Sequence, residues 1–266
     1  MNKKSLAFVA LLLPVLMLSP SVTWADSQPA VAALGNNASF AEVSPLAQQG
    51  NAEAQNRLGF MYDNGQGVAK DVKQAAYWYR KAAEQGLAKA QSNMGLEYAG
   101  GWDGGQGVPQ DYEQAIYWYQ KAAEQGNAGA QVNLGTLYAN GQGVAQDYQQ
   151  AMYWYQKAAA QGNADAQYGI GTMYQAGQGV AQDYKQAFYW YQKAAEQGQA
   201  MAENNLGAAY NNASGVAQDK TKAAYWFSKS AMQGYAVAQK NLENLYATPD
   251  SGGGPTYVRP VYNHRR

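Results

Sequence analysis

Residues 51–86 read NAEAQNRLGFMYDNGQGVAKDVKQAAYWYRKAAEQG, and this unit decides the fold. It recurs as residues 87–126, 127–162, 163–198 and 199–234, and a half-copy follows at 235–246. The second copy is longer because GGWDGGQGV replaces NGQGV in its loop. Upstream, PLAQQG at 45–50 resembles the end of a copy and predicts a capping half-helix. Self-similarity at a fixed period is typical of repeat architectures.

Each copy divides into two halves that carry apolar residues at helical spacing. The stripe of the first half consists of Ala54, Leu58, Met61 and Tyr62. The stripe of the second half consists of Ala75, Trp78, Tyr79, Ala82 and Ala83. Because residues at i, i+3, i+4 and i+7 share one face of a helix, each copy is predicted to form two helices. The GQGV segment at 65–68 separates them.

Two further positions recur in every copy and concern helix packing and helix starts. Gly59 recurs at positions 95, 135, 171 and 207. Glycine inside a helix costs about 1 kcal/mol relative to alanine, so its recurrence predicts helices that approach closely there. Asp71 recurs at positions 111, 147, 183 and 219, in the predicted first turn of the second helix. A carboxylate there interacts favourably with the helix dipole.

The hairpins predict an all-α fold. Two such short helices cannot bury both stripes alone, whereas stacked neighbours can, so we predict an α-solenoid of five hairpins with flanking capping half-helices. The predicted domains are a signal peptide at 1–25, a linker and N-terminal cap at 26–50, the repeat solenoid at 51–246 and a disordered tail at 247–266. The tail is rich in glycine and proline and basic, and contact with an acidic lipid or a partner is the alternative to disorder.

The recurring residues resemble the Sel1-like repeat, a relative of the tetratricopeptide repeat. The shared pattern is A-x-A-Q-x-x-L-G-x-x-Y, then G-x-G-V-x-x-D, then A-x-x-W-Y-x-K-A-A-x-Q-G, and it covers 51–234 plus the half-copy. The resemblance implies a superhelix of five Sel1-like hairpins whose first helices line a concave groove. It also implies protein–protein interaction, in envelope adaptors, signalling regulators, secreted host-contact factors or secretion-system immunity proteins. One branch is cysteine-rich with reported β-lactam binding, and this chain departs from it because it has no cysteine.

Composition excludes several classes of function. Lys and Arg number 19 and Asp and Glu number 19, and this balance argues against a nucleic-acid binder, which needs a basic face. Cysteine is absent, and the single histidine, His264, lies next to the C-terminus. A zinc site of Cys or His and a Ser-His-Asp triad are therefore not expected. The G-Q-G triplets lack the later glycine of a dinucleotide loop, so we expect no catalytic residues, no cofactor and no metal.

The N-terminus has the order of a secretory signal. Lys3 and Lys4 precede an apolar run at 6–18, and small residues follow as far as Ala25. The run is too short to span a bilayer well, so we predict cleavage after Ala25 and no stable membrane anchor in the mature chain. An uncleaved anchor is the alternative. The mature protein is expected to be periplasmic or secreted.

A partner-specific surface is expected at the variable positions of the first helices. Identical positions are explained by packing between repeats, whereas the face away from Ala54 and Leu58 varies between copies. That face mixes charged, amide, aromatic and small side chains, as a specific protein surface does. The candidate protein-binding residues are Phe60, Asp63, Leu96, Trp102, Thr136, Tyr168, Thr172 and Gln175.

The aromatic residues leave alternatives open. Phe60 and Tyr168 are candidate anchors because aromatic side chains dominate binding hot spots, and packing against the adjacent hairpin is the alternative. Trp102, in the glycine-rich loop of the second copy, either contacts a partner or folds onto its own solenoid. Five tyrosines of the second helices either stack on saccharide or peptide or are partly buried between repeats: Tyr77, Tyr117, Tyr153, Tyr189 and Tyr225. The tryptophans that follow them are predicted core: Trp78, Trp118, Trp154, Trp190 and Trp226.

Three functions are consistent with the sequence. The first is an exported, non-enzymatic scaffold or adaptor that binds another protein in its concave groove. The second, implied by the family resemblance alone, is an immunity protein that neutralises a secretion-system effector such as a phospholipase. The third is a β-lactam-binding or hydrolysing enzyme, against which the missing cysteines and catalytic motifs argue.

Overall fold

The computed structural model describes residues 37–100 and 107–247, and within these ranges its regular secondary structure consists of α-helices joined by loops. A leading helix, α2 (Phe40–Gln48), precedes five hairpins. The hairpins are α3 (Ala52–Asn64) with α4 (Val72–Glu84), α5 (Ala88–Ala99) with α6 (Tyr112–Glu124), α7 (Ala128–Asn140) with α8 (Tyr148–Ala160), α9 (Ala164–Ala176) with α10 (Tyr184–Glu196), and α11 (Ala200–Asn212) with α12 (Lys220–Met232). A final helix, α13 (Ala236–Ala247), follows them. The predicted signal peptide, residues 248–266 of the tail and Trp102 lie outside the described residues.

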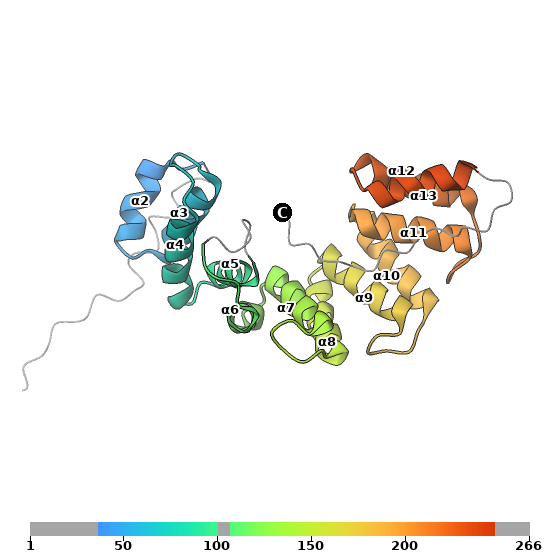
Figure 1. Ribbon diagram of the computed structural model, residues 1–266, viewed down its shortest axis with the longest axis horizontal. Helices are drawn as coiled ribbons and strands as arrows, with labels where there is room; N and C mark the ends of the chain where they lie inside the picture. Colours follow the sequence, from blue (N-terminus) through green and yellow to red (C-terminus); the bar gives the residue numbers. More distant parts are fainter. Residues whose placement is uncertain (1–36, 101–106, 248–266) are drawn as a thin grey trace, which may run out of the picture.

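The hairpins stack in chain order. Each first helix packs against its own second helix and against the second helix of the hairpin before it. Together they follow an arc, and in its middle α5 and α7 lie on the inner side while α6 and α8 lie on the outer side (Figure 1). The predicted fold class, an α-solenoid of five hairpins with a flanking helix at each end, is confirmed.

Side-chain caps fix where the helices begin. The side chain of Asn51 accepts a hydrogen bond of 2.9 Å from the Ala54 amide at the start of α3. Asp71 precedes α4 and accepts hydrogen bonds of 3.0 Å from the amides of Lys73 and Gln74. Such a cap stabilises a helix by about 1 kcal/mol. The recurring aspartates are therefore N-caps, one position earlier than the predicted first turn: Asp111, Asp147, Asp183 and Asp219.

The loop inside a hairpin contacts the hairpin before it. In the third hairpin Gly143 has a φ of +70°, and a Cβ there would stand 2.5 Å from the Cβ of Tyr112. Only glycine combines a left-handed backbone with so close an approach. The neighbouring Gln142 donates a hydrogen bond of 3.1 Å from Nε2 to the Tyr112 hydroxyl. The G-x-G-V loop thus joins consecutive hairpins as well as connecting two helices.

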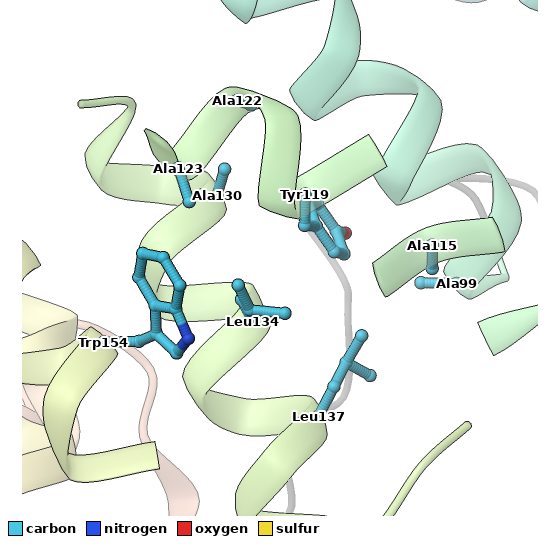
Figure 2. Packing of buried hydrophobic residues seen from close by; sticks show 9 residues of the cluster. All are labelled: Ala99, Ala115, Tyr119, Ala122, Ala123, Ala130, Leu134, Leu137 and Trp154. Atoms are coloured by element: carbon cyan, nitrogen blue, oxygen red, sulfur yellow. The ribbon is translucent and has the colours of Figure 1, made fainter. Parts of the chain in front are cut away.

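The core is a series of clusters, each lying between two hairpins. In the cluster of Figure 2, Tyr119 and Ala122 come from α6, Leu134 and Leu137 from α7, and Trp154 from α8. In this cluster one second helix meets both helices of the next hairpin, so a hairpin buries its apolar stripes only against its neighbours. The predicted core tryptophans all pack into such clusters, Trp118 and Trp154 buried and the other three half-buried: Trp78, Trp190 and Trp226.

The recurring glycine of the first helix lies against the second helix, as its position predicts. A Cβ at Gly59 would stand 2.7 Å from the ring of Tyr79. The equivalent glycines, at 95, 135, 171 and 207, face rings at the equivalent position of their own second helices: Tyr119, Tyr155, Tyr191 and Phe227.

Glutamine side chains connect the two helices of a hairpin with the element before them. Gln85 donates from Nε2 to Oε1 of Gln55 (2.6 Å), and Gln55 donates from Nε2 to the carbonyl of Ala47 in α2 (3.1 Å). The glutamine pair recurs in the next three hairpins: Gln125 with Gln91, Gln161 with Gln131 and Gln197 with Gln167.

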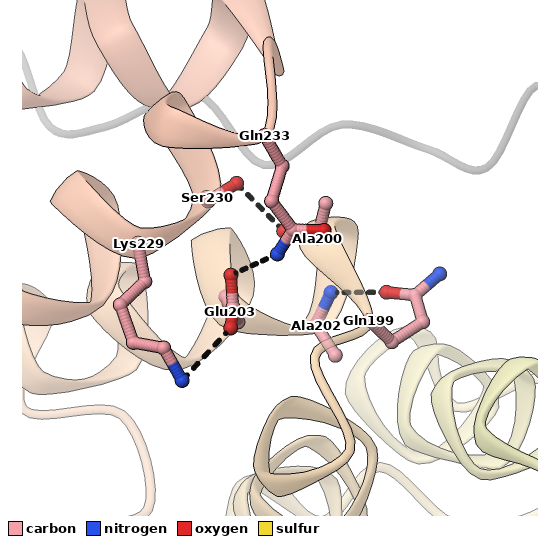
Figure 3. A network of polar contacts seen from close by, with 7 residues as sticks. All are labelled: Gln199, Ala200, Ala202, Glu203, Lys229, Ser230 and Gln233. Carbon is pink, nitrogen blue, oxygen red and sulfur yellow. Dashed lines mark hydrogen bonds and ion pairs between the residues drawn. The ribbon is translucent and has the colours of Figure 1, made fainter.

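The fifth hairpin replaces this glutamine with a carboxylate. Glu203 is fully buried and accepts a hydrogen bond of 2.7 Å from Nε2 of Gln233. Its Oε1 lies 3.1 Å from Nζ of Lys229, which supplies the opposite charge (Figure 3). Beside it the Ser230 hydroxyl donates to the carbonyl of Ala200 (2.7 Å). A buried carboxylate is stable only with such partners, so the last hairpin is held by an ion pair where the others use amides.

Candidate functional site

The structure describes seven of the eight candidate residues and places them in different environments. Phe60 on α3 is exposed (50%), and it is the only exposed large apolar side chain on the first helices of the five hairpins, as far as the described residues go. Leu96 on α5 and Thr172 and Gln175 on α9 are half-buried. We call these four residues the first-helix surface. Trp102 lies outside the described residues.

Asp63 lies inside the solenoid. Its side chain is buried at the end of α3. Burial raises the pKa of the Tyr79 hydroxyl far above its ordinary value, and the charges of Asp63 and Glu97 raise it further. Glu97 is also buried, at a position where three other copies carry Met61, Leu137 and Met173. The Asp63 carboxylate is thus part of the interior and is not presented to a partner.

Thr136 also belongs to the interior. It is 1% exposed, and its hydroxyl donates to the carbonyl of Val132 at 3.0 Å. The same oxygen lies 3.0 Å from the hydroxyl of Tyr155, whose ring packs on the glycine of this hairpin. Gln175 has a similar role in the next hairpin, because its Oε1 accepts a hydrogen bond from the Tyr191 hydroxyl at 2.5 Å. These variable positions anchor the hydroxyl groups of core tyrosines.

Tyr168 is not a surface anchor. Its side chain is fully buried on α9, and its ring lies 5.8 Å from that of Tyr191, centroid to centroid. Burial raises the pKa of its hydroxyl. Of the two interpretations of this residue, packing against neighbouring hairpins is the one the structure shows.

In two other copies the position of Tyr168 also contacts the next repeat, through Asn56 and Asn204. Asn93 on α5 donates from Nδ2 to Oδ1 of Asn56 on α3 (3.0 Å). At the end of the array, Asn241 on α13 donates to Oδ1 of Asn204 on α11 (2.9 Å). Variation at this position therefore reflects the match between neighbouring repeats. The sequence spacing could have indicated these contacts, because the two residues of each pair are 37 positions apart in the chain.

The second helices carry an exposed aromatic row that the candidate set did not include. Tyr77, Tyr117, Tyr153, Tyr189 and Tyr225 are 48%, 45%, 46%, 46% and 57% exposed. We call these residues the tyrosine row. Each ring contacts the tryptophan that follows it in the chain, edge to face, with centroids 4.9–5.3 Å apart. Partial burial agrees with one of the two interpretations of these rings, and about half of each side chain still faces solvent.

Two further properties bear on function. No helix in the described ranges is long and apolar enough to cross a membrane. Within the same ranges, no three His, Cys, Asp or Glu side chains gather in an arrangement that could hold a metal ion.

Comparison with known families identifies the repeat unit. The sequence model of the Sel1 repeat matches five consecutive segments, residues 52–87, 88–127, 128–163, 164–199 and 200–235. Each segment begins at the first residue of a hairpin's first helix and ends three residues after its second helix.

Solved structures have the same architecture. A Sel1 repeat protein from Oxalobacter formigenes is 41% identical, with a TM-score of 0.70 over 74% of this chain and 77% of that one. The protective antigen c5321 of uropathogenic Escherichia coli is 36% identical, with a TM-score of 0.58 over 79% of this chain and 52% of that one. The immunity protein Pa5087 from Pseudomonas aeruginosa is 24% identical, with a TM-score of 0.50 over 90% of this chain and 92% of that one, a likeness that shows the fold alone.

One curated relative is a sel1-like repeat-containing protein of Acanthamoeba polyphaga mimivirus. It is 41% identical over 56 residues, which are 21% of this chain. The chain spans only 10% of that relative's length, so the similarity concerns the repeat unit and not the whole viral protein.

Proposed function

This chain belongs to the Sel1 repeat family, and we propose that it is an exported, non-catalytic scaffold that binds another protein through the first-helix surface. The observation that carries the proposal is the exposure of Phe60, half of whose side chain faces solvent on α3. A few residues contribute most of the binding free energy at protein interfaces, and large aromatic side chains are enriched among them. A ring held on a rigid helix also loses little entropy on binding, because its backbone is already fixed.

The arrangement of the first helices supports the same role. In the middle of the arc the first helices lie on its inner side, so a partner placed there contacts several hairpins at once (Figure 1). Each helix of 13 residues is about 20 Å long. A typical interface buries about 800 Å² on each partner, which a few such helices can supply. Phe60 and Leu96 lie on consecutive first helices and form the apolar part of this surface.

The proposed binding residues differ from the set expected from the sequence. Phe60, Leu96, Thr172 and Gln175 remain candidates because their side chains reach solvent. The interior side chains, Asp63, Thr136 and Tyr168, would act on binding only by positioning the helices. Trp102 stays a candidate contact on the loop of the second hairpin.

Export is part of the proposal and rests on the N-terminal sequence. Two lysines, an apolar run and small residues ending at Ala25 have the order of a secretory signal. Processing in the envelope would leave a chain that begins at Asp26, which N-terminal sequencing of protein purified from the periplasm or medium would show. Full-length protein found only in the cytoplasm would contradict export.

Binding is tested with a double variant, Phe60→Ala with Leu96→Ala, in the full mature chain. The control is Met232→Ala, which removes an 88% exposed side chain at the end of α12. Affinity capture from envelope extract is expected to retain the same partner on the wild type and the control, and to lose most of it on the double variant. Equal capture by all three proteins would refute the role of the first-helix surface, and steady turnover of a chromogenic β-lactam by pure protein would refute the non-catalytic assignment.

The second candidate function is immunity against a secreted effector such as a phospholipase. It is motivated by Pa5087, an immunity protein that shares this fold over nearly its whole length. The test is a competition between sibling cells, in which a strain lacking this chain and its neighbouring genes is complemented with or without the chain. Protection restored by the chain supports immunity. Survival that does not depend on the chain contradicts it.

A further inference from the structure

The tyrosine row forms a second exposed surface, on the second helices and separate from the first-helix surface. We propose that this row binds an acidic polysaccharide, with sugar rings stacked on the tyrosines and carboxylates paired with the adjacent lysines. The proposal does not depend on the proposed protein scaffold, because the two surfaces share no residue.

The rings of the tyrosine row are held in a fixed orientation by the neighbouring tryptophans. In the third hairpin the planes of Tyr153 and Trp154 cross at 76°, with centroids 4.9 Å apart. The tryptophan is buried and fixes the tyrosine, so about half of the ring stays in solvent at a defined angle. An aromatic face that is already oriented loses little conformational entropy when the C–H groups of a sugar ring stack on it. The same geometry repeats in all five hairpins.

A lysine lies over each ring, one helical turn further along. Nζ of Lys121, Lys157 and Lys193 lies 4.7, 4.7 and 4.8 Å from the centroid of its tyrosine. Within the described residues, none of these three ammonium groups has a carboxylate in ion-pair distance, whereas the equivalent Lys229 is paired with Glu203. In the part of the chain that the structure describes, the middle hairpins therefore present ammonium groups that lie over aromatic rings and have no ion-pair partner. A ligand carboxylate can add to such a site without displacing a protein partner.

The third hairpin is the most favourable of the three for an anion. Glu124 ends α6 and Glu196 ends α10, each exposed and near the lysine of its own helix. In α8 the equivalent position is Ala160, and that helix contains no acidic residue. We therefore expect Lys157 to contribute most to the binding of a carboxylate.

Amide groups complete the chemistry of the surface. Gln114, Gln150 and Gln186 are exposed, one turn before the tyrosines of the three middle hairpins. Amides both donate and accept, so they suit the hydroxyl groups of sugars. A tyrosine ring, an amide and a lysine over the ring thus recur at the same positions in the three middle hairpins. A polymer with repeated rings and carboxylates can engage several hairpins at once, which multiplies weak single contacts.

Other polymers fit the row less well. A nucleic acid carries a phosphate at every nucleotide and is bound by strongly basic surfaces, whereas this chain has 19 basic and 19 acidic residues. A lipid bilayer would be met by exposed aliphatic side chains, whereas the exposed large apolar residues are mostly tyrosines. A lysine over a tyrosine ring in each middle hairpin matches the chemistry of an acidic polysaccharide.

The test measures binding of polygalacturonate to the full mature chain by isothermal titration calorimetry at low salt. Dextran serves as the neutral polymer and galacturonate as the monomer. We expect the wild type to bind polygalacturonate, and the triple variant Tyr117→Ala, Tyr153→Ala and Tyr189→Ala to lose at least tenfold in affinity. A second variant, Lys121→Gln with Lys157→Gln and Lys193→Gln, should lose affinity similarly and lose most of the salt dependence. Galacturonate should bind far more weakly than its polymer.

The control is Tyr246→Ala, which removes a 74% exposed tyrosine on α13, outside the row. It should bind as the wild type does, and so should Phe60→Ala with Leu96→Ala, which separates this proposal from the protein scaffold. The lysine variant keeps the test valid if the tyrosine variant does not fold. No binding by the wild type, undiminished binding by both row variants, or tighter binding of dextran or single-stranded DNA than of polygalacturonate would overturn the proposal.

Discussion

In the third hairpin the ring of Tyr155 lies so close to Gly135 that a Cβ on this glycine would stand 2.9 Å from ring carbons Cδ1 and Cε1. The same ring is 3% exposed and contacts Thr136 through its hydroxyl. Real Cβ atoms do not approach an aromatic carbon so closely. Because protein interiors are close-packed, moving the ring or the helix to make room raises the free energy of the folded state. The glycine therefore sets the distance between the two helices of the hairpin.

Gly135→Ala is expected to lower the free energy of unfolding by about 1–3 kcal/mol, because the added methyl group pushes α7 away from α8. The matched control is Gly129→Ala in the same helix, an exposed position where the nearest atom to a new Cβ is 3.4 Å away. This control should be neutral or stabilising by up to about 1 kcal/mol, because alanine favours the helix. Urea denaturation measures both, and equal effects of the two substitutions would contradict the close-packing role.

The buried carboxylate of the fifth hairpin predicts a strong coupling between two substitutions. Lys229→Met should lower the free energy of unfolding by about 1–3 kcal/mol, because it leaves Glu203 buried without its opposite charge. The range lies below that of a fully buried pair because the lysine side chain is 38% exposed. When Glu203→Gln is already present, as glutamine is in the first four hairpins, the same substitution should cost less than about 1 kcal/mol. A double-mutant cycle by thermal denaturation checks this, and an identical cost in both backgrounds would rule out the coupling.

The aspartate caps predict that a neutral amide can replace the carboxylate. Asp147 accepts hydrogen bonds of 2.9 and 3.0 Å from the amides of Gln149 and Gln150. Asp147→Ala should lower the free energy of unfolding by about 1 kcal/mol, whereas Asp147→Asn should lower it by less than half as much. Amide hydrogen exchange at the start of α8 reports the change locally. An asparagine variant as unstable as the alanine variant would mean that the negative charge, and not the cap, is what matters.

Asp219 predicts a dependence of stability on pH. A hydrogen bond from the Lys222 amide, at 2.9 Å, and the nearby Lys222 ammonium hold the pKa of this carboxyl below its ordinary value of 3.8. A depressed folded-state pKa means that the stabilisation is present above the unfolded pKa and is lost as the pH falls through the folded one. Asp219→Asn should therefore destabilise the protein at neutral pH, and this effect should shrink as the pH falls through the folded-state pKa. NMR titration of the carboxyl measures the pKa directly, and a value at or above 3.8 would be inconsistent with the cap geometry.

Much of the fold could be predicted from the sequence because its determinants are local and repeated. The stripe around Leu58, the glycine at 59 and the aspartate at 71 each constrain one turn of helix, and five copies confirm one another. The predicted hairpins, the close approach at the glycine and the core tryptophans are all found in the structure. The recurring aspartate was predicted in the first turn of the second helix, whereas the structure shows it one position earlier, as the N-cap.

The candidate site was less predictable because exposure depends on the neighbouring repeat. Phe60 and Thr136 occupy equivalent positions, yet one is exposed and the other is buried against Tyr155. Tyr168 fits inside because the next residue is Gly169, where other copies have asparagine or arginine, and a Cβ on this glycine would stand 3.1 Å from the Tyr155 ring. Such compensation between adjacent positions is set by three-dimensional contacts. A helical pattern identifies the face but not the space available on it.

The central claim, that a protein partner binds the first-helix surface, is tested most directly by site-specific photo-crosslinking in living cells. A photoreactive phenylalanine analogue at Phe60, half exposed on α3, is compared with the same analogue at Met232, the 88% exposed position at the end of α12. We predict that irradiation joins one discrete protein to the chain from position 60 and not from position 232, and that Leu96→Ala weakens this product. Crosslinking that is absent at position 60, or equal at both positions, would contradict the claim.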